Sequence, residues 1–260
     1  SLWVTPLTTM PTQPTYQLDS PHNYWTSLTF STKVAVRNAV GYKVYFDSRG
    51  ATRSGIADFV NLFTDASKKN YWGSPLFAGA VNTGAWDPNN VIYISNSSFL
   101  LSFTAASTSS GTIGWGFKLW VTPIYDAVPF QPTFHVDSPH NYWSGLTTLS
   151  TIAVPGAVAY AVHFDDKSVT RTGIADFVSL FQDSSLKTYW GSPYYAGALG
   201  SGAWNSTSVV IVYASSFVMN FVASTTSSGT IGWGYSLWVT PLTTMPTQPT
   251  YQLDSPHNYW

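Results

Sequence analysis

Asp19, Ser20 and His22 bring an acid, a hydroxyl and an imidazole together, and the segment recurs from Asp137 to His140. A hydrolase uses these three groups as a relay, in which the acid orients the imidazole and the imidazole reaches the hydroxyl. Near neighbours stiffened by Pro21 cannot adopt that geometry. Asp, Ser and Pro in this order are typical of a turn. We therefore predict no catalytic residue here and no enzyme activity.

Two short segments fit the acceptor pattern for N-glycosylation. They are Asn96-Ser97-Ser98 and Asn205-Ser206-Thr207. The pattern predicts N-linked glycans at Asn96 and Asn205 on surface loops of a secreted protein. Only 9% of the residues are charged, so glycans would supply solubility that charge does not. The pattern alone leaves bare surface turns as the alternative.

The chain contains 12 tryptophans, most of which we expect to build cores. Trp120 is different, because the alternation of a strand turns it away from the face that carries Leu119 and Val121. Trp238 occupies the same place in a second copy of the segment. We predict that Trp120 and Trp238 contact either a neighbouring unit or a ligand such as a sugar.

The composition of the 260 residues excludes several classes of protein. The sequence is 44% hydrophobic and 17% aromatic with a net charge of −1, which excludes a disordered chain and gives no basic footprint for nucleic acid. No apolar run approaches the roughly 20 residues that cross a membrane. All 12 acidic residues are Asp, cysteine is absent, and Ser, Thr, Val and aromatic residues are abundant. This composition favours strands and turns, and therefore an all-β protein.

Internal repetition defines the organisation of the chain. Residues 1–25 recur letter for letter as residues 236–260, and a degenerate copy places Ser138 at the position of Ser20, 118 residues later. Pro- and Thr-rich stretches separate the copies. We predict residues 1–13 as the tail of a preceding repeat with its linker, 14–123 as a first β-sandwich, 124–132 as a linker, 133–241 as a second β-sandwich, and 242–260 as a linker and the start of a following repeat.

Strand patterns recur within each copy. Residues 42–47 alternate between apolar and polar types, and 90–95, 99–103 and 116–122 read similarly. Residues 56–63 would also suit a helical face, and we interpret them as a strand. Several short strands joined by Gly, Ser and Asn turns predict tandem antiparallel β-sandwiches.

These residues resemble the CUB family, and more narrowly its cysteine-free, CUB-like modules in large extracellular repeat proteins. The resemblance rests on the segments 20–25, 42–47, 58–60 and 115–117. It implies a jelly-roll type of sandwich that acts as an extracellular interaction unit and is not an enzyme.

The resemblance also implies a calcium site at one end of each unit, through Asp47 and Asp58 in the first and Asp165 and Asp176 in the second. Near the place of the family's later acidic ligand the sequence has Ala105 and Ala106. Two carboxylates leave most of the six to eight oxygen ligands of calcium to carbonyls and water. No cofactor is otherwise required.

From these patterns we predict a non-catalytic structural protein, built from tandem repeats, in an extracellular fibre or cell-surface appendage. Its partners are neighbouring copies of the same repeat. The alternative is a multivalent adhesin that binds carbohydrate weakly at each unit. The surroundings of Trp120 and Trp238 discriminate between the two: burial between units favours the structural protein, and an open groove with Asp or Asn favours the adhesin.

Overall fold

The computed structural model describes residues 15–53, 57–81, 84–107, 112–171, 175–199, 204, 206–225 and 231–247. Within these ranges the first strands are β1 (Tyr16–Asp19), β2 (Thr29–Val34), β3 (Gly41–Phe46), β4 (Phe59–Phe63), β5 (Ile92–Ile94), β6 (Phe99–Thr104) and β7 (Lys118–Ile124), with the 3-10 helix η1 (Gly84–Trp86) before β5. They are followed by β8 (Phe134–Asp137), β9 (Thr147–Ile152), β10 (Ala159–Phe164), β11 (Asp176–Phe181), β12 (Val210–Val212), β13 (Phe217–Ala223) and β14 (Ser236–Leu242). No helix in the described part of the chain is long and apolar enough to span a membrane.

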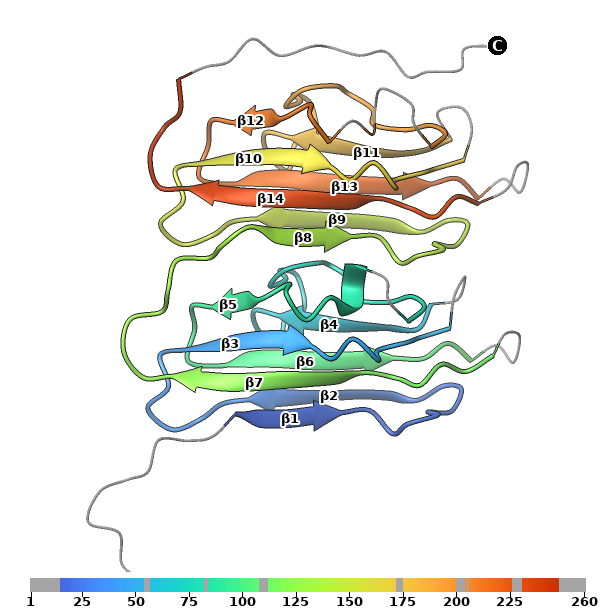
Figure 1. Cartoon of the computed structure of the whole chain (residues 1–260), viewed down its shortest axis with the longest axis vertical. Coiled ribbons are helices and arrows are strands. Elements are labelled where there is room, and N and C mark those ends of the chain that lie inside the picture. Colours follow the sequence, from blue (N-terminus) through green and yellow to red (C-terminus); the bar gives the residue numbers. More distant parts are fainter. Residues whose placement is uncertain are drawn as a thin grey trace, which may run out of the picture.

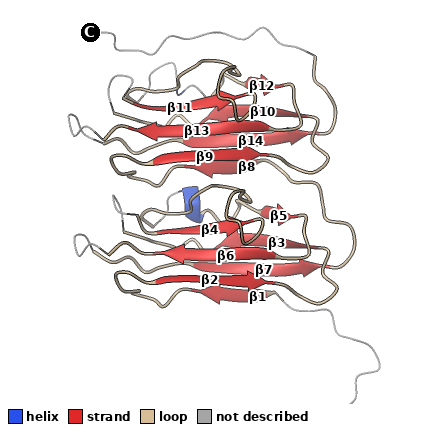
Figure 2. Cartoon of the chain, turned by 180° about the vertical axis from the view of Figure 1, so that it is seen from behind, coloured by secondary structure: helices blue, strands red, loops and turns tan. Residues whose placement is uncertain are grey.

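The strands form two sandwiches of the same design. In sandwich 1 the sheet β1-β7-β3-β5 faces the sheet β2-β6-β4, and in sandwich 2 the sheet β8-β14-β10-β12 faces β11-β13-β9. The neighbouring strands pair antiparallel. The four-stranded sheets face the viewer in Figure 1, and the three-stranded sheets face the viewer in Figure 2. The prediction of antiparallel β-sandwiches is therefore confirmed.

Alternating side chains explain why these segments form two layers. Tyr42, Val44 and Phe46 on β3 are buried, whereas Lys43 and Tyr45 between them are only partly covered. Aromatic rings join the layers: the rings of Tyr42 on β3 and Phe99 on β6 lie 5.3 Å apart at 70°. The segment that also suited a helix is the strand β4, whose residues are mostly buried.

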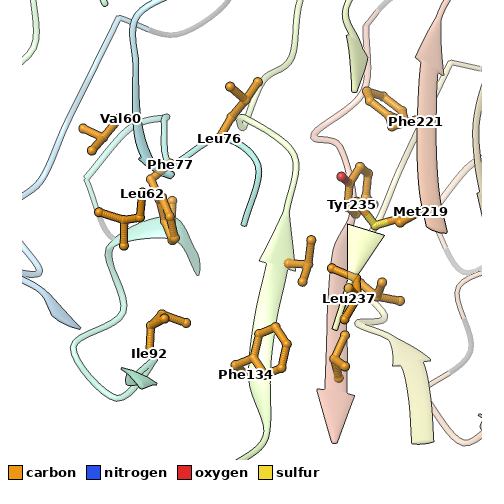
Figure 3. Packing of buried hydrophobic residues seen from close by; sticks show 14 of the residues in the cluster. Val60, Leu62, Leu76, Phe77, Ile92, Phe134, Met219, Phe221, Tyr235 and Leu237 are labelled. Atoms are coloured by element: carbon orange, nitrogen blue, oxygen red, sulfur yellow. The ribbon is translucent and has the colours of Figure 1, made fainter. Parts of the chain in front are cut away.

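The sandwiches are stacked along the longest axis of the molecule, and their strands run across that axis (Figure 1). Their buried side chains form one hydrophobic cluster rather than two. Figure 3 shows Leu76 of sandwich 1 and Phe134 of β8 in the region between the two sets of core residues. The exposed fractions of these two side chains are only 8% and 4%. The junction between the sandwiches is thus part of the core.

Strand β7 runs through Pro123 to Ile124, one residue into the segment predicted as a linker. Proline cannot donate a backbone hydrogen bond, which confines it to places where one side of a strand lacks a partner. β1 pairs with β7 only as far as Val121, so Pro123 lies where that side of β7 is open. The strand therefore tolerates a proline that the sequence pattern treats as its end.

Candidate functional site at the junction between the sandwiches

The Asp-Ser-Pro-His segment forms a turn and no relay. The backbone N–H of Phe117 donates to Ser20 Oγ over 3.0 Å, and His22 Nδ1 lies 3.3 Å from the carbonyl oxygen of Trp115. His22 Nε2 is 3.7 Å from Asp19. The serine hydroxyl therefore binds the backbone of Phe117, just before β7, instead of the imidazole.

Asp58 and Asp176, two of the four aspartates that the family resemblance assigns to calcium, are buried and paired with arginine. Arg53 Nε donates to Asp58 Oδ2 over 2.6 Å and its Nη2 donates to Asp58 Oδ1 over 3.0 Å. The Tyr24 hydroxyl adds a hydrogen bond of 2.6 Å, and the backbone N–H of Ala106 adds one of 2.7 Å. Both carboxylate oxygens of Asp58 are thus occupied.

Sandwich 2 repeats this cluster with Arg171, Asp176 and Tyr142. Arg171 donates to Asp176 over 2.6 and 2.8 Å, and the Tyr142 hydroxyl also donates to it. Burial, followed by the hydrogen bond to the aspartate, raises the pKa of both Tyr24 and Tyr142. The tyrosines are therefore neutral donors to the buried ion pairs.

Asp47 and Asp165, the other two predicted ligands, lie at the surface. Asp47 is held by Arg49, whose Nε and Nη2 donate over 2.9 and 2.8 Å, and this hydrogen bonding lowers the pKa of Asp47 to about 2. Asp165 accepts the backbone N–H of Lys167 over 2.9 Å. Among the described residues no three His, Asp, Glu or Cys side chains are grouped as metal ligands. Calcium binding stays a prediction, with an arginine already beside Asp58 as its countercharge.

Asn96 is exposed in the short connection between β5 and β6. Asn205 lies outside the described residues. Glycosylation at both positions stays a prediction.

The junction is most visible in the contrast between β1 and β8, which hold the same place in the two sandwiches. β1 alternates between half-buried and exposed residues, whereas all four residues of β8 are buried. The difference arises because sandwich 1 covers β8. In the same way His140 is 2% exposed, while its counterpart His22 is open to solvent.

Polar contacts fix the junction at the edge of sandwich 1. The side-chain amide of Gln131 pairs with the open edge of β5: its Oε1 accepts the N–H of Tyr93 over 2.7 Å and its Nε2 donates to the carbonyl of Val91 over 2.8 Å. The Ser74 hydroxyl donates to the carbonyl of Asp137 over 3.0 Å. Gln131 therefore satisfies backbone groups that an edge strand otherwise leaves open.

An aromatic pair adds to these contacts. The rings of Phe59 on β4 and Trp143 in sandwich 2 lie 6.5 Å apart and nearly parallel, at 16°. Such pairs stabilise an interface beyond the area that they bury. The junction thus combines an apolar core, edge hydrogen bonds and ring contacts.

Trp238 lines an open groove of about 360 Å³ at this junction. Its ring lies on the outer face of β14, between His135, whose ring centroid is 3.5 Å away, and His163, at 6.1 Å and nearly parallel. Sandwich 2 supplies His135, Asp165, Lys167, Trp233, Ser236 and Trp238 to the groove, and sandwich 1 supplies Ser48, Trp86, Asp87 and Pro88.

Trp120 holds the equivalent place on β7 of sandwich 1. It is half-buried while Leu119 and Val121 beside it are fully buried, as the alternation predicts. The ammonium group of Lys118 lies 5.8 Å from its ring centroid. The structure places Trp238 at the junction and Trp120 on the outer face of sandwich 1, so the two are not brought together.

Asp137 at the end of β8 is the least expected residue of the junction. It is 1% exposed, and neither carboxyl oxygen has a hydrogen-bond partner of normal geometry. Burial raises its pKa to about 7, against a smaller lowering by the Ser236 hydroxyl opposite it. Burial lowers the pKa of the nearby His140 to about 4. Both groups are thus held toward their neutral forms.

Sequence reasoning missed Gln131, Asp137 and the Phe59–Trp143 pair. One signal was available for Gln131, because Gln-Pro-Thr recurs in all three linkers, with glutamine at positions 13, 131 and 248. Nothing in the sequence distinguishes the buried Asp137 from Asp19, since the two segments read alike.

Comparison with known proteins places the chain in no established family. No family model and no curated protein matches it. It is similar to the CUB1-EGF-CUB2 domain of human MASP-1/3, with a TM-score of 0.35 and 13% identity over 88% of this chain and 99% of that one. It is also similar to the extracellular region of zebrafish Gpr126/Adgrg6, with a TM-score of 0.33 and 13% identity over 88% of this chain and 35% of that one. The glycosylasparaginase PNGase F from Flavobacterium meningosepticum is similar with a TM-score of 0.33 and 8% identity over 89% of this chain and 97% of that one.

Proposed function

We propose that this chain is a non-catalytic structural protein, built from tandem CUB-like β-sandwiches of an extracellular fibre or cell-surface appendage. The observation that carries the proposal is the junction. β8 is buried along its whole length against sandwich 1, and Gln131 ties the linker to the edge of β5. A shared core of this kind holds successive units at a fixed spacing, which is what a load-bearing or spacing element needs.

Small-angle X-ray scattering of the full chain tests this proposal. Two sandwiches in a fixed stack give one narrow distribution of distances, in agreement with the stacked arrangement. The double variant Gln131→Ala/Phe134→Ala removes an edge contact and a buried ring of the junction and should broaden the distribution. A wild-type profile that already fits two independently moving sandwiches would contradict a structural role based on stacking.

The extracellular location is supported by the two glycosylation acceptors and the low charge of the chain. Expression in a secreting eukaryotic host tests it directly. We expect wild-type protein to lose mass when N-glycans are removed enzymatically, and Asn96→Gln to lose less. Unmodified protein from the wild-type chain would leave Asn96 as a bare surface turn and remove this support.

A multivalent carbohydrate-binding adhesin is the second candidate, and the groove favours it. Trp238 offers a partly exposed ring beside Asp165 and Lys167, and aromatic faces flanked by polar groups suit sugars. A glycan array probed with the full chain should give signals that Trp238→Ala abolishes and Trp120→Ala retains. Equal losses in both variants, or no signal in the wild type, would argue against a sugar site in this groove.

A further inference from the structure

Sandwich 1 and sandwich 2 each carry a counterpart of one of the two surfaces that meet at the junction. We call the surface of β1 with Asp19, His22 and Trp25 the β1 face. The surface formed by β12 with Phe177, Ser192 and Tyr194 is the β12 face. At the junction the corresponding surfaces of β8 and β5 bury each other.

The β1 face exposes what its counterpart hides. The Trp25 side chain is 58% exposed, the largest exposed aromatic surface among the described residues, whereas Trp143 in the same place is packed against the core and stacks on Phe59. Asp19 and His22 are exposed, while Asp137 and His140 are buried. Tryptophan is enriched among the residues that carry the binding energy of protein interfaces.

The β12 face has the local geometry of the surface that receives β8. Ser192 Oγ donates to the carbonyl of Tyr194 over 3.0 Å, as Ser74 Oγ donates to Leu76 over 2.9 Å. Ser74 in addition reaches the carbonyl of Asp137.

The aromatic partner is present on the β12 face as well. Phe177 is half-buried at the position of Phe59 and touches Tyr194 edge-on, with ring centroids 4.8 Å apart. One contact of the junction has no equivalent: the backbone N–H of His135 donates to Asn90, and Ser208 stands at the place of Asn90. The serine and the aromatic position of the junction therefore both have counterparts on the β12 face.

We infer that the β12 face of one chain binds the β1 face of a second copy, in the arrangement that the two sandwiches already adopt within one chain. Trp25 of one copy would stack on Phe177 of the other, as Trp143 stacks on Phe59 at the junction. The two surfaces differ, so the contact is heterologous and leaves one free face of each kind at the ends of every assembly. This inference rests on the proposed structural function and extends it from stacking within a chain to stacking between chains.

Association between copies should be weaker than the internal junction. The linker holds sandwich 2 beside sandwich 1 at a high effective concentration, which separate chains lack. Sedimentation velocity over a concentration series therefore tests the inference, with dimers and longer species expected to grow with concentration in the wild type.

Charge substitutions identify the faces. Trp25→Arg and Phe177→Arg should each weaken association at least tenfold, as expected for central aromatic anchors. Mixed one to one they should form dimers and nothing larger, because each variant keeps the face that the other has lost. Leu149→Arg is the matched control. Leu149 is 48% exposed although the junction within the chain is formed, and it belongs to neither the β1 face nor the β12 face. It should associate like the wild type.

Circular dichroism and thermal melting confirm that each variant is folded, and the exposed Trp25 position keeps the test valid if Phe177→Arg is unstable. Dimers that persist in both variants, or variants that fail to dimerise when mixed, would overturn the inference. Residues 251–260 repeat the sequence 16–25, so Trp260→Arg is also compared. Stronger association in that variant would mean that the chain's own C-terminal segment competes for the β12 face. It would overturn the inference that a second copy is the occupant.

Electron microscopy of concentrated protein gives a second readout. Four strands about 4.8 Å apart give each sandwich about 20 Å along the stacking axis, so a filament should show that spacing and about twice it. A wild-type chain that stays monomeric at all concentrations but scatters as a fixed stack would overturn this inference and leave the proposed function standing.

Discussion

At the scale of single residues, the two sandwiches depend on buried ion pairs that are fully hydrogen-bonded. Arg53 and Asp58 have side chains that are 1% and 0% exposed. Burying two charges is costly, and the geometry here offsets that cost because Tyr24 and the backbone of Ala106 complete the shell of the carboxylate. Removing one partner would leave the other charge without compensation.

Arg53→Met should therefore lower the free energy of unfolding by about 3 to 5 kcal/mol, measured by urea denaturation. Arg49→Met is the matched control, because it breaks the same type of pair with Asp47 at the surface, where solvent screens it. We expect no measurable loss in the control. Equal losses would show that the buried position of Arg53 is not the cause.

The same denaturation with and without millimolar calcium chloride tests the calcium prediction. A cation that displaces Arg53 from Asp58 would raise the stability of the wild type, and that rise would disappear in Asp58→Asn.

Asp137 predicts an unusual dependence of stability on pH. Burial raises its pKa to about 7, so the folded chain holds a proton that an unfolded aspartate loses near pH 4. This contribution is complete below pH 4 and is lost as the pH rises through 7. Burial lowers the pKa of His140 to about 4, so His140 contributes in the opposite sense. The stability that neutral His140 contributes is present above pH 6.5 and is lost as the pH falls through 4.

We expect Asp137→Asn to gain stability relative to wild type as the pH rises from 4 to 7. The shift corresponds to a few kcal/mol at most. Chemical denaturation at a series of pH values measures it, and Asp19→Asn, at the exposed counterpart, serves as the control. A pH profile that does not change in Asp137→Asn would mean that this carboxyl titrates normally.

At the scale of elements, the edge of β5 shows how a linker takes part in a sheet. The amide of Gln131 imitates a peptide group and binds both an N–H and a carbonyl of the edge. Edge strands otherwise present unpaired backbone to solvent or to other chains. The linker thus caps sandwich 1 while it delivers β8 to its position.

Gln131→Ala should expose the amide of Tyr93, because its hydrogen bond ends on the Gln131 side chain. We expect hydrogen exchange at Tyr93 to become at least tenfold faster, with little change inside β3. Gln17→Ala is the matched control, since the Gln17 side chain donates to Asp19 over 2.6 Å and its strand β1 lies at the edge of sandwich 1 farthest from the junction (Figure 1). An unchanged exchange rate at Tyr93 in Gln131→Ala would contradict the hydrogen bond between the linker and the edge of β5.

At the scale of the whole molecule, the continuous core predicts coupled unfolding. Leu76 and Phe134 belong to one buried cluster with the interiors of both sandwiches. Calorimetry of the wild type should therefore show a single transition. Phe134→Ala, which removes a buried ring worth about 3 to 5 kcal/mol, should separate it into two. Two transitions in the wild type would mean that the junction adds no coupling.

The strands themselves were accessible to sequence reasoning. Alternation identified β3, β6 and β7 and turned Trp120 outward from Leu119 and Val121. β1 and β2 were missed because their patterns are short and largely polar, and they become strands only by pairing with β7 and β6. The site was less accessible: the resemblance singled out Asp58 but could not show that Arg53, five residues earlier, would bind it.

Alternation and self-similarity are local properties of the chain, so the all-β class and the internal repetition could be inferred from the residues alone. That sandwich 1 covers β8, that Asp137 is buried while the equivalent Asp19 is open, and that Trp238 lines a groove became apparent only from the folded arrangement. Identical segments acquire different environments through what is stacked on them, and stacking depends on contacts between residues far apart in the sequence.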